Sequence, residues 1–323
     1  MKSFGSPVPP HHPHSETLTH VHWQQVTLPL PDGRQQPLQV LRLDRCDALA
    51  PGNKIFKLSG LLRTARQREC RRLLSFGGPW SNHLHALAAL GREMDLQTVG
   101  LVRGEDLATP TLVEAAGWGM ALYPLSRSLY RQRHDPAFQL ACMQDYRADM
   151  LIPEGGDCPE GARGCQVIGA AIRQRFESGA QVVVATGTGT TLAGIVAGLD
   201  KRFQVLGISA LKGALDTQQR ILANLQALAG DNDETLADWR LYHEFHCGGF
   251  ARTNSELRAV IAWGDHHGLP LEPVYTGKAL LALRSLLSSG DIDAGRPLVL
   301  VHTGGLQGRR GFDWLALGAQ PGH

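Results

Sequence analysis

The stretch QVVVATGTGTTLAGIVAGL, residues 181–199, joins two apolar segments through a turn rich in glycine and threonine. The run Val182–Val184 is typical of a buried parallel strand, and the residues from Leu192 onward favour a helix. In the turn, glycines let backbone N–H groups approach an anion, threonine hydroxyls add donors, and the helix N-terminus contributes partial positive charge. The sequence therefore predicts a phosphate-binding loop here, with an ordinary strand-to-helix turn as the alternative. The predicted loop consists of Thr186, Gly187, Thr188, Gly189 and Thr190.

Two commoner phosphate-binding motifs do not match the chain. A dinucleotide fingerprint needs glycine or alanine three residues after Gly189, where this sequence has Leu192. A Walker loop needs serine or threonine after Gly277–Lys278 and glycine at position 272, where the sequence has Ala279 and Glu272. The loop is therefore expected to bind a compact phosphomonoester.

Outward from this loop, predicted strands alternate with predicted helices, which indicates an α/β fold with a parallel, doubly wound sheet. The predicted strands are 73–76, 98–102, 120–123, 150–152, 181–185, 204–209 and 298–301, and the predicted helices are 82–94, 111–118, 126–133, 161–177, 192–199 and 216–229. A hairpin of residues 24–30 and 36–43 is expected before them. Such sheets bind ligands beyond the carboxyl ends of their strands.

Glycines near Lys54 and at Gly155–Gly156 divide this alternation into two parts. We expect residues 58–158 to form a small lobe, inserted in a larger lobe made of residues 1–57 and 159–323. Residues 1–20, which include a proline-interrupted histidine tract, are expected to be disordered, and no metal site is assigned to them.

The composition bounds the kind of partner. The chain has 323 residues, with 32 basic against 30 acidic side chains and a formal charge of +2, so nothing favours nucleic acid or an anionic membrane as partner. No apolar run has the length of a signal peptide or of a membrane span, which predicts a cytoplasmic protein. The six cysteines include no Cys-x-x-Cys pair, so neither a disulfide framework nor a zinc site is expected. A small molecule is the expected ligand.

Four further segments join a glycine turn to a strand end or a helix start: GNK at 52–54, GGPWSN at 77–82, YTGK at 275–278 and HTGG at 302–305. A lysine on a glycine-bounded turn becomes nucleophilic toward a carbonyl when burial lowers its pKa, although most such turns are plain surface turns. Ser81 or Asn82 can cap a helix whose free N–H groups bind a carboxylate, or can simply begin that helix. The segments at 275–278 and 302–305 are expected to be turns at strand ends, and none of the four segments identifies a site alone.

Taken in order, the five segments resemble the motifs of the pyridoxal-phosphate-dependent family that contains D-cysteine desulfhydrase and 1-aminocyclopropane-1-carboxylate deaminase. The matching motifs run from residue 52 to residue 305, which is most of the chain. The resemblance implies fold type II, the tryptophan-synthase-β-like fold with two parallel-sheet α/β lobes. It also implies pyridoxal 5'-phosphate as cofactor, a small amino acid as substrate, lyase or deaminase activity, and a homodimer.

The same resemblance implies roles for individual residues. Lys54 would hold the cofactor as a Schiff base, and Asn82 would bond the phenolate oxygen of the cofactor. The loop from Thr186 to Thr190 would hold the phosphate. Ser81 would lie near the substrate carboxylate or take part in the acid–base step, and Tyr275 would lie beside the cofactor ring as a further catalytic residue.

Thr303 matches the family residue that faces the pyridine nitrogen. A hydroxyl donates to a neutral pyridine nitrogen, whereas a carboxylate would keep that nitrogen protonated. A neutral ring is a poorer electron sink, which favours removal of the α-proton, with Lys54 as the base, followed by prompt β-elimination. In the cyclopropane-opening relatives the two late motifs resemble Tyr-Glu-Gly-Lys and His-Leu-Gly-Gly. These motifs have glutamate and leucine at the positions of Thr276 and Thr303 in this chain.

We therefore expect a D-cysteine desulfhydrase-like α,β-elimination that gives pyruvate, ammonia and sulfide. A 1-aminocyclopropane-1-carboxylate deaminase is the alternative, and a cofactor-binding protein without turnover is an alternative of another class. Pro79–Trp80 and Leu84–His85 depart from the family pattern beside the expected carboxylate site. Trp80 and Leu84 are expected either to narrow the substrate pocket or to redirect it toward another amino acid.

Overall fold

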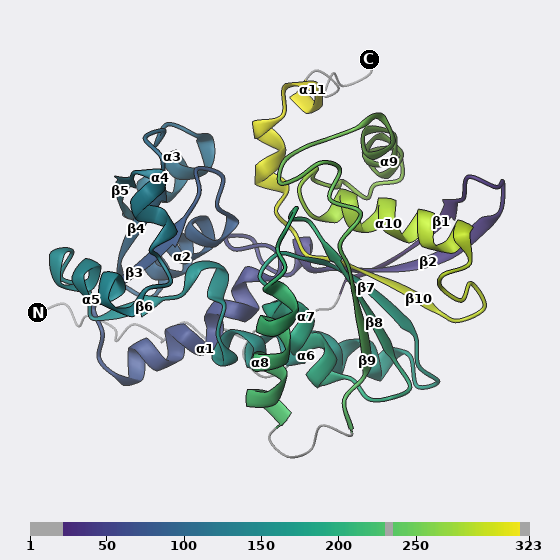
Figure 1. The fold of residues 1–323 in the computed structure, drawn as a ribbon, viewed down its shortest axis with the longest axis horizontal. Coiled ribbons are helices and arrows are strands. Elements are labelled where there is room, and N and C mark those ends of the chain that lie inside the picture. Colours follow the sequence, from purple (N-terminus) through teal and green to yellow (C-terminus); the bar gives the residue numbers. More distant parts are fainter. Residues whose placement is uncertain (1–21, 230–234, 317–323) are drawn as a thin grey trace, which may run out of the picture.

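The computed structural model describes residues 22–229 and 235–316, which form two β-sheets flanked by helices. Figure 1 shows the smaller sheet on the left and the larger sheet on the right. In spatial order, the six-stranded sheet contains β1 (Trp23–Pro29), β2 (Gln35–Arg42), β10 (Leu298–His302), β7 (Gln181–Thr186), β8 (Gln204–Ser209) and β9 (Asp238–Tyr242). The four-stranded sheet contains β5 (Ala121–Leu125), β4 (Gln97–Arg103), β3 (Arg72–Gly77) and β6 (Met150–Ile152). Residues 1–20, which were predicted to be disordered, lie outside the described residues.

Strand direction places several loops at one edge of each sheet. β1 and β2 pair antiparallel, which confirms the predicted hairpin, and the other paired strands of the described sheets run parallel. Because β2, β10 and β7 are parallel neighbours, the segments that follow them emerge at the same edge of the large sheet. The prediction of an α/β fold with parallel sheets is confirmed.

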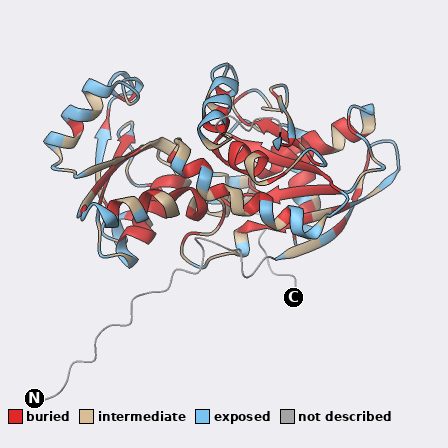
Figure 2. Cartoon of the chain, turned by 90° about the horizontal axis from the view of Figure 1, so that it is seen from below, coloured by how far each residue is buried: buried red, intermediate tan, exposed pale blue. Residues whose placement is uncertain are grey.

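The helices cover both faces of the large sheet. Neighbouring strand residues point to opposite faces, so Val183 packs with α9 (Ser255–His266) and α10 (Thr276–Ser289), whereas Val182 and Val184 pack with α6 (Pro159–Arg175) and α7 (Thr190–Gly198). The helix α8 (Thr217–Ala229) belongs to the second of these layers. Figure 2 shows that buried residues gather along the sheets and the helices packed on them.

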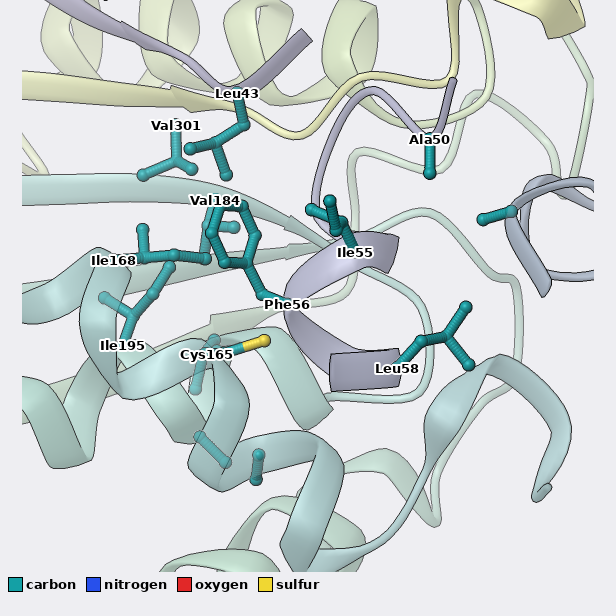
Figure 3. Close-up of a cluster of buried hydrophobic side chains, with 14 of the residues drawn as sticks. Leu43, Ala50, Ile55, Phe56, Leu58, Cys165, Ile168, Val184, Ile195 and Val301 are labelled. Carbon is teal, nitrogen blue, oxygen red and sulfur yellow. The ribbon is translucent and has the colours of Figure 1, made fainter. Parts of the chain in front are cut away.

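One hydrophobic cluster joins the two sheets. It includes residues of α6, α7, β7 and β10 and continues through α1 (Lys54–Gln67) to α2 (Asn82–Glu93) and α3 (Pro110–Gly117), which pack on the small sheet. Figure 3 shows Phe56 of α1 with Val184 and Ile195 in this cluster. The helices α4 (Arg127–Arg131) and α5 (Pro136–Asp145) contribute to a separate cluster on the other face of the small sheet. The first turn of α1 is therefore held by both halves of the core.

The structure differs from the sequence predictions at several elements. Lys54 was expected on a turn, but it is the first residue of α1, because the residues after it bury a helical face in the shared core. The segment from Tyr275 to Lys278 was expected at a strand end and instead begins α10. The predicted boundary between residues 57 and 58 falls inside α1, and the division into two lobes at these residues stays a prediction. No helix among the described residues is long and apolar enough to cross a membrane.

Candidate active site

Two segments that are far apart in the sequence, one around Gly52 and one around Gly304, pair with each other at the centre of the site. Gly52 and Gly304 form an antiparallel bridge, and Asn53 N–H donates to the Thr303 carbonyl at 3.0 Å. A Cβ atom added to Gly52 would lie 2.4 Å from the Thr303 carbonyl oxygen, and Gly52 has a φ of +99°, so this approach requires glycine. The contact places Lys54 beside the carboxyl end of β10.

Lys54 has a partly buried side chain with one hydrogen-bond partner among the described residues. Its Nζ donates to Asn53 Oδ1 at 3.2 Å, and Asn53 Nδ2 donates to Thr191 Oγ1 at 2.8 Å. Burial, followed by the positive charge of Lys57, lowers the pKa of Lys54 to about 7. A large share of this amine is therefore neutral near neutral pH, and the neutral form is the one that attacks a carbonyl carbon.

The predicted phosphate loop lies between the end of β7 and the start of α7. Gly189 precedes α7 with a φ of +90°, and a Cβ atom there would lie 2.5 Å from Ile221 Cγ1. Thr188 Oγ1 and Thr190 Oγ1 are 2.8 Å apart, and Thr190 Oγ1 donates to Asp157 Oδ1 at 2.8 Å. The first turn of α7 offers free N–H groups, which is the feature that binds phosphate at helix N-termini.

Thr186 contributes less than its place in the motif suggests. Its hydroxyl donates to the Val184 carbonyl at 3.3 Å, and a Cβ atom added to Gly207 would lie 2.9 Å from that hydroxyl. The Thr186 side chain therefore faces the neighbouring strand β8, which leaves the backbone of Thr186 as its contribution to the loop.

Lys57 is a functional candidate that the sequence analysis missed. Its buried Nζ donates to the Gly155 carbonyl at 3.1 Å and to Thr188 Oγ1 at 3.3 Å, so a cation sits against the phosphate loop. Burial lowers the pKa of Lys57. The signal was available in the sequence, because a lysine three residues after Lys54 shares the same face of a helix. The reading of residues 52–54 as a turn concealed it.

Asn82 begins α2 and lies against the segment after β10. Ser81 caps this helix, because its Oγ accepts the N–H of Leu84 at 3.2 Å. A Cβ atom added to Gly305 would lie 2.7 Å from Asn82 Nδ2, so glycine at 305 permits the contact. Within residues 22–229 and 235–316, the buried Asn82 Oδ1 has no hydrogen-bond partner. An amide end buried without a partner indicates that a ligand completes this part of the site.

Tyr275 lies at the start of α10 with its ring against the phosphate loop. A Cβ atom added to Gly187 would lie 3.3 Å from Tyr275 Cε1, and the Phe250 ring meets the Tyr275 ring edge-on with centroids 6.2 Å apart. Burial raises the pKa of Tyr275, which keeps its hydroxyl protonated at neutral pH. The Glu272 carboxylate accepts the N–H groups of Val274, Tyr275 and Thr276 at 2.7, 2.7 and 2.6 Å and so fixes the first turn of α10.

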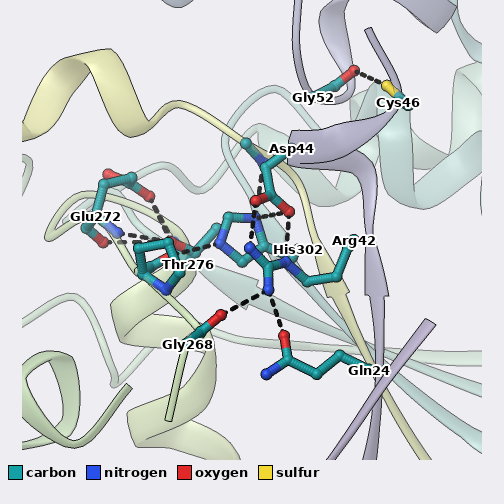
Figure 4. Close-up of polar contacts among 11 residues, drawn as sticks. Gln24, Arg42, Asp44, Cys46, Gly52, Gly268, Glu272, Thr276 and His302 are labelled. Atoms are coloured by element: carbon teal, nitrogen blue, oxygen red, sulfur yellow. Dashed lines mark hydrogen bonds and ion pairs between the residues drawn. The ribbon is translucent and has the colours of Figure 1, made fainter. Parts of the chain in front are cut away.

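Thr303 follows β10 and is 7% exposed, and its hydroxyl makes no hydrogen bond to any described residue. A buried ion pair supports the strand end before it (Figure 4). Asp44 Oδ2 lies 2.6 Å from Arg42 Nη2, and Asp44 Oδ1 lies 3.1 Å from His302 Nδ1. His302 Nε2 also lies 2.7 Å from the Pro270 carbonyl. These contacts hold the backbone of Thr303 in a fixed place.

The residues that depart from the family pattern have different surroundings. Leu84 is fully buried in the core of the small sheet, and a Cβ atom added to Gly77 would lie 2.7 Å from it, so its effect on the substrate pocket stays a prediction. The Trp80 ring lies against Gly311 of η4 (Leu306–Gly311), since a Cβ atom there would lie 3.1 Å from Trp80 Cε2. Trp80 thus joins the small-sheet side of the site to the segment after β10.

A second contact joins the same two parts of the molecule. Arg310 of η4 binds Glu114 of α3 through two hydrogen bonds of 2.5 and 2.8 Å, and His85 Nε2 lies 2.8 Å from Glu114 Oε2. The side-chain hydrogen bond from Arg310 is the main cause that lowers the pKa of Glu114 to about 2. The carboxylate therefore stays charged across the pH range in which enzymes work.

The donors in this site fit a phosphate ester that carries an aldehyde and a ring hydroxyl. Lys57 and the start of α7 suit the phosphate, and the Lys54 amine suits the aldehyde carbon. The Asn82 amide suits the ring oxygen, because its unpartnered Oδ1 can accept from a ring hydroxyl and its Nδ2 can donate to an ionised one. These are the groups of pyridoxal 5'-phosphate. Apart from Thr186, whose side chain faces the sheet, the residues predicted from the sequence gather in this one region.

Comparison with known proteins supports this reading. The family model described as pyridoxal-phosphate dependent enzyme matches residues 39–304. A Pyrococcus abyssi protein named "Putative 1-aminocyclopropane-1-carboxylate deaminase" is 30% identical over 272 residues, covering 80% of this chain and 81% of that protein. D-cysteine desulfhydrase from Salmonella newport is 28% identical over 270 residues, covering 79% and 82% of the two chains.

A solved structure described as an ACC deaminase homologue superimposes with a TM-score of 0.77 at 22% identity, covering 92% of this chain and 93% of the other. This likeness confirms the fold-type II architecture. The cofactor expected from the motifs is confirmed by the family match over residues 39–304. The chain therefore belongs to the pyridoxal-phosphate-dependent enzymes, in the family that contains D-cysteine desulfhydrase and 1-aminocyclopropane-1-carboxylate deaminase.

Proposed function

We propose that this enzyme catalyses α,β-elimination from a small amino acid in the manner of a D-cysteine desulfhydrase, releasing pyruvate, ammonia and sulfide. The observation that carries the proposal is the Lys54 amine, whose pKa is lowered to about 7 and which is linked through Asn53 to Thr191 at the start of α7. A nucleophilic lysine beside a phosphate loop is what a carbonyl cofactor with a phosphate handle requires.

The residues around Lys54 supply the binding contacts for the cofactor. Lys57, Thr188 and the N–H groups of the first turn of α7 would hold the phosphate, and Asn82 would donate to the ring oxygen through its Nδ2 group, which lies beside Gly305. Tyr275 would lie beside the ring. When bound, the cofactor supplies an electron-withdrawing group that acidifies the α-hydrogen of an attached amino acid.

Lys54 would act as the base for that α-hydrogen, because an amine with a pKa near 7 is both available in its neutral form and basic enough to accept a proton. Tyr275 keeps its proton, since burial raises the pKa of its hydroxyl, so it can donate to a departing group. Below about pH 7 protonation of the free Lys54 amine would remove the base, and we expect turnover to fall on the acidic side.

The substrate carboxylate would bind at the start of α2. Ser81 accepts the N–H of Leu84, while the hydroxyl proton of Ser81 remains available to a carboxylate oxygen. The free N–H groups of the first helical turn add donors at the same place. Ser81 therefore serves as helix cap and carboxylate donor at once.

The side chain expected beside the pyridine nitrogen of the cofactor, Thr303, favours elimination. The Thr303 side chain is mostly buried, and its hydroxyl, which makes no hydrogen bond to any described residue, can donate to a neutral nitrogen. The nearby carboxylate of Glu272 already accepts three backbone N–H groups of α10 and the Thr276 hydroxyl at 3.2 Å. Nothing in these contacts presents a carboxylate to the ring, which fits elimination better than chemistry that needs a protonated ring.

Opening of 1-aminocyclopropane-1-carboxylate is the second candidate, because the relative from Pyrococcus abyssi bears the name of that deaminase. At the positions of Thr276 and Thr303, the motifs of the cyclopropane-opening relatives resemble ones with glutamate and leucine. The two threonines of this chain therefore favour elimination. Binding of the cofactor without turnover is the third reading.

A panel assay separates these readings. Purified enzyme with its visible cofactor band would be given D- and L-amino acids with β-leaving groups, including D-cysteine and β-chloro-D-alanine, beside 1-aminocyclopropane-1-carboxylate, and release of 2-oxo acid would be scored. We expect pyruvate from at least one β-substituted amino acid. Activity confined to the cyclopropane would contradict the proposal, and a coloured enzyme silent across the panel would favour binding without turnover.

A further inference from the structure

His83 has a buried ring nitrogen that no described residue satisfies. It follows Asn82 in the first turn of α2 and is 3% exposed. Its Nε2 lies 2.9 Å from Ser75 Oγ, and Ser75 Oγ donates to the Ile152 carbonyl at 2.7 Å. Because the single proton of Ser75 goes to that carbonyl, Ser75 accepts the hydrogen bond from His83 Nε2–H.

This arrangement fixes the tautomer of His83. With the proton on Nε2, the Nδ1 atom of a neutral ring carries a lone pair, and Nδ1 has no partner within the described ranges. Burial, followed by the charges of Lys54 and Lys57, lowers the pKa of His83 to about 3, so the ring stays neutral at working pH. A neutral acceptor buried without a donor is costly unless a donor reaches it during function.

The donor is on the neighbouring helix. The helices α1 and α2 pack together, and the charges of Lys54 and Lys57, both in the first turn of α1, act on His83. Lys57 already donates to Gly155 and Thr188, whereas Lys54 Nζ donates only to Asn53 Oδ1 at 3.2 Å among the described residues. An amine has more than one N–H, and the lysine stem has four rotatable bonds, so Lys54 can turn from Asn53 toward His83.

We propose that His83 is a positioning residue for Lys54: its Nδ1 accepts a hydrogen bond from the free Lys54 amine and thereby directs the lone pair of that amine. The inference deepens the proposed function, since it rests on Lys54 as the base, and it concerns the amine whenever no covalent bond engages it. Asn53 and His83 are then two alternative acceptors for one amine.

The proposal fixes the direction of a measurable change. A neutral acceptor stabilises the protonated amine, so removal of the His83 nitrogen lowers the pKa of Lys54. A hydrogen bond to a charged group contributes enough for a shift of about one pH unit, which is about tenfold in the free-amine fraction at a fixed acidic pH. The other titratable groups that act on Lys54 are Lys57 on α1, Cys165 on α6 and Glu272 before α10.

The test is trace acetylation of the full chain freed of cofactor, with the reactivity of Lys54 followed by peptide mapping across pH. We expect the labelling midpoint of Lys54 to fall by about one unit in His83→Leu and to return most of the way in His83→Gln, which restores an acceptor. His85→Leu is the matched control, because the His85 imidazole lies on the same helix and binds Glu114 instead; it should leave the midpoint unchanged.

An unchanged midpoint in His83→Leu, or an equal shift in His85→Leu, overturns the proposal. Nitrogen NMR of histidine side chains in the wild-type chain, with His83→Gln used to assign the signal, gives a second measurement: a protonated Nδ1 on His83 also overturns it. Neither measurement needs turnover. A colourless, inactive protein would contradict the proposed function, while the labelling and NMR results would still decide the role of His83.

Discussion

Lys54 and Lys57 lie three residues apart on the same buried turn, yet their contacts give them different chemistry. Lys57 donates to the Gly155 carbonyl and to Thr188, so its ammonium is held at the phosphate loop. The Lys54 amine makes fewer hydrogen bonds: it donates only to Asn53 Oδ1, at 3.2 Å, among the described residues, and its pKa is lowered to about 7. Burial lowers the pKa of both lysines, and the charge of Lys57 lowers that of Lys54 further. The number of hydrogen-bond partners then decides which amine is free to react.

We therefore predict that Lys54→Ala abolishes turnover and leaves the fold intact. Alanine is the best helix former, and the substitution removes a partly buried amine with one hydrogen bond rather than a packed apolar group. Borohydride reduction of the wild-type holoenzyme followed by peptide mapping should label Lys54, and circular dichroism should not distinguish the variant from wild type.

Lys278 provides a control for that experiment. Its buried Nζ donates to the carbonyls of Ala210 and Gly249 at 3.2 and 2.8 Å, so Lys278→Met should lower the melting temperature and retain the label on Lys54. Label on Lys57 or Lys278 in the wild-type protein would refute the assignment of Lys54.

At the scale of elements, the loop between β7 and α7 depends on a chain of polar contacts that begins outside it. Lys57 donates to Thr188, Thr188 lies 2.8 Å from Thr190, and Thr190 donates to Asp157, which is paired with Arg220 at 2.9 Å. The loop is thus held between a cation and an anion, and a charge change at its centre should disturb phosphate binding more than folding.

Thr188→Asp should weaken cofactor affinity by about two orders of magnitude or more. Two like charges about 4 Å apart repel by about 4 kcal/mol at an effective dielectric constant of about 20, and the new carboxylate would also neutralise Lys57. Thr188→Ser is the matched control, because it keeps the hydroxyl and should bind the cofactor almost as wild type does. Titration of the cofactor against both variants measures the difference; equal affinities would place the phosphate elsewhere.

Most elements near the motifs were predictable, and the missed elements share physical causes. The strands and helices of residues 73–102 and 181–229 follow the expected alternation, because each strand is a short apolar run. The helix α1 was missed because the glycine and asparagine just before Lys54 were read as a turn, although Arg63, Arg66 and Gln67 form an exposed polar stripe on it. The edge strand β9, with its partly exposed residues, gives no apolar run to detect.

At the scale of the whole molecule, η4 connects the segment after β10 to the small-sheet side of the site. Trp80 lies against Gly311, and Arg310 binds Glu114. Because η4 directly follows Gly305, which contacts Asn82, these outer contacts also bear on the alignment of Asn82 with the rest of the site. The homodimer and the cytoplasmic location expected for this enzyme stay predictions.

We predict that Arg310→Met raises the substrate KM several-fold while the melting temperature changes little. A surface-exposed ion pair such as Arg310–Glu114 contributes about 0–1 kcal/mol to stability. Its main effect should therefore be on the alignment of η4 with α3, which lie on the two sides of the site. Arg309→Met is the matched control, since Arg309 binds Asp265 with bonds of 2.9 and 2.7 Å on the large-sheet side alone. Steady-state kinetics and thermal unfolding of both variants test this; an equal rise in KM in Arg309→Met would show that the effect does not come from the contact between Arg310 and Glu114.

The sequence by itself determined the alternation of strands and helices, the glycine- and threonine-rich loop between β7 and α7 and the order of the motifs, because each depends on residues close together in the chain. Tertiary structure alone decided which of these segments meet. Lys57 and Thr188 are 131 residues apart, Asn53 and Thr191 are 138 apart, and no local pattern pairs them. Their contacts arise because parallel strands bring their carboxyl ends to one edge and a shared core holds α1 against α6, a long-range packing result that no local stretch of sequence contains.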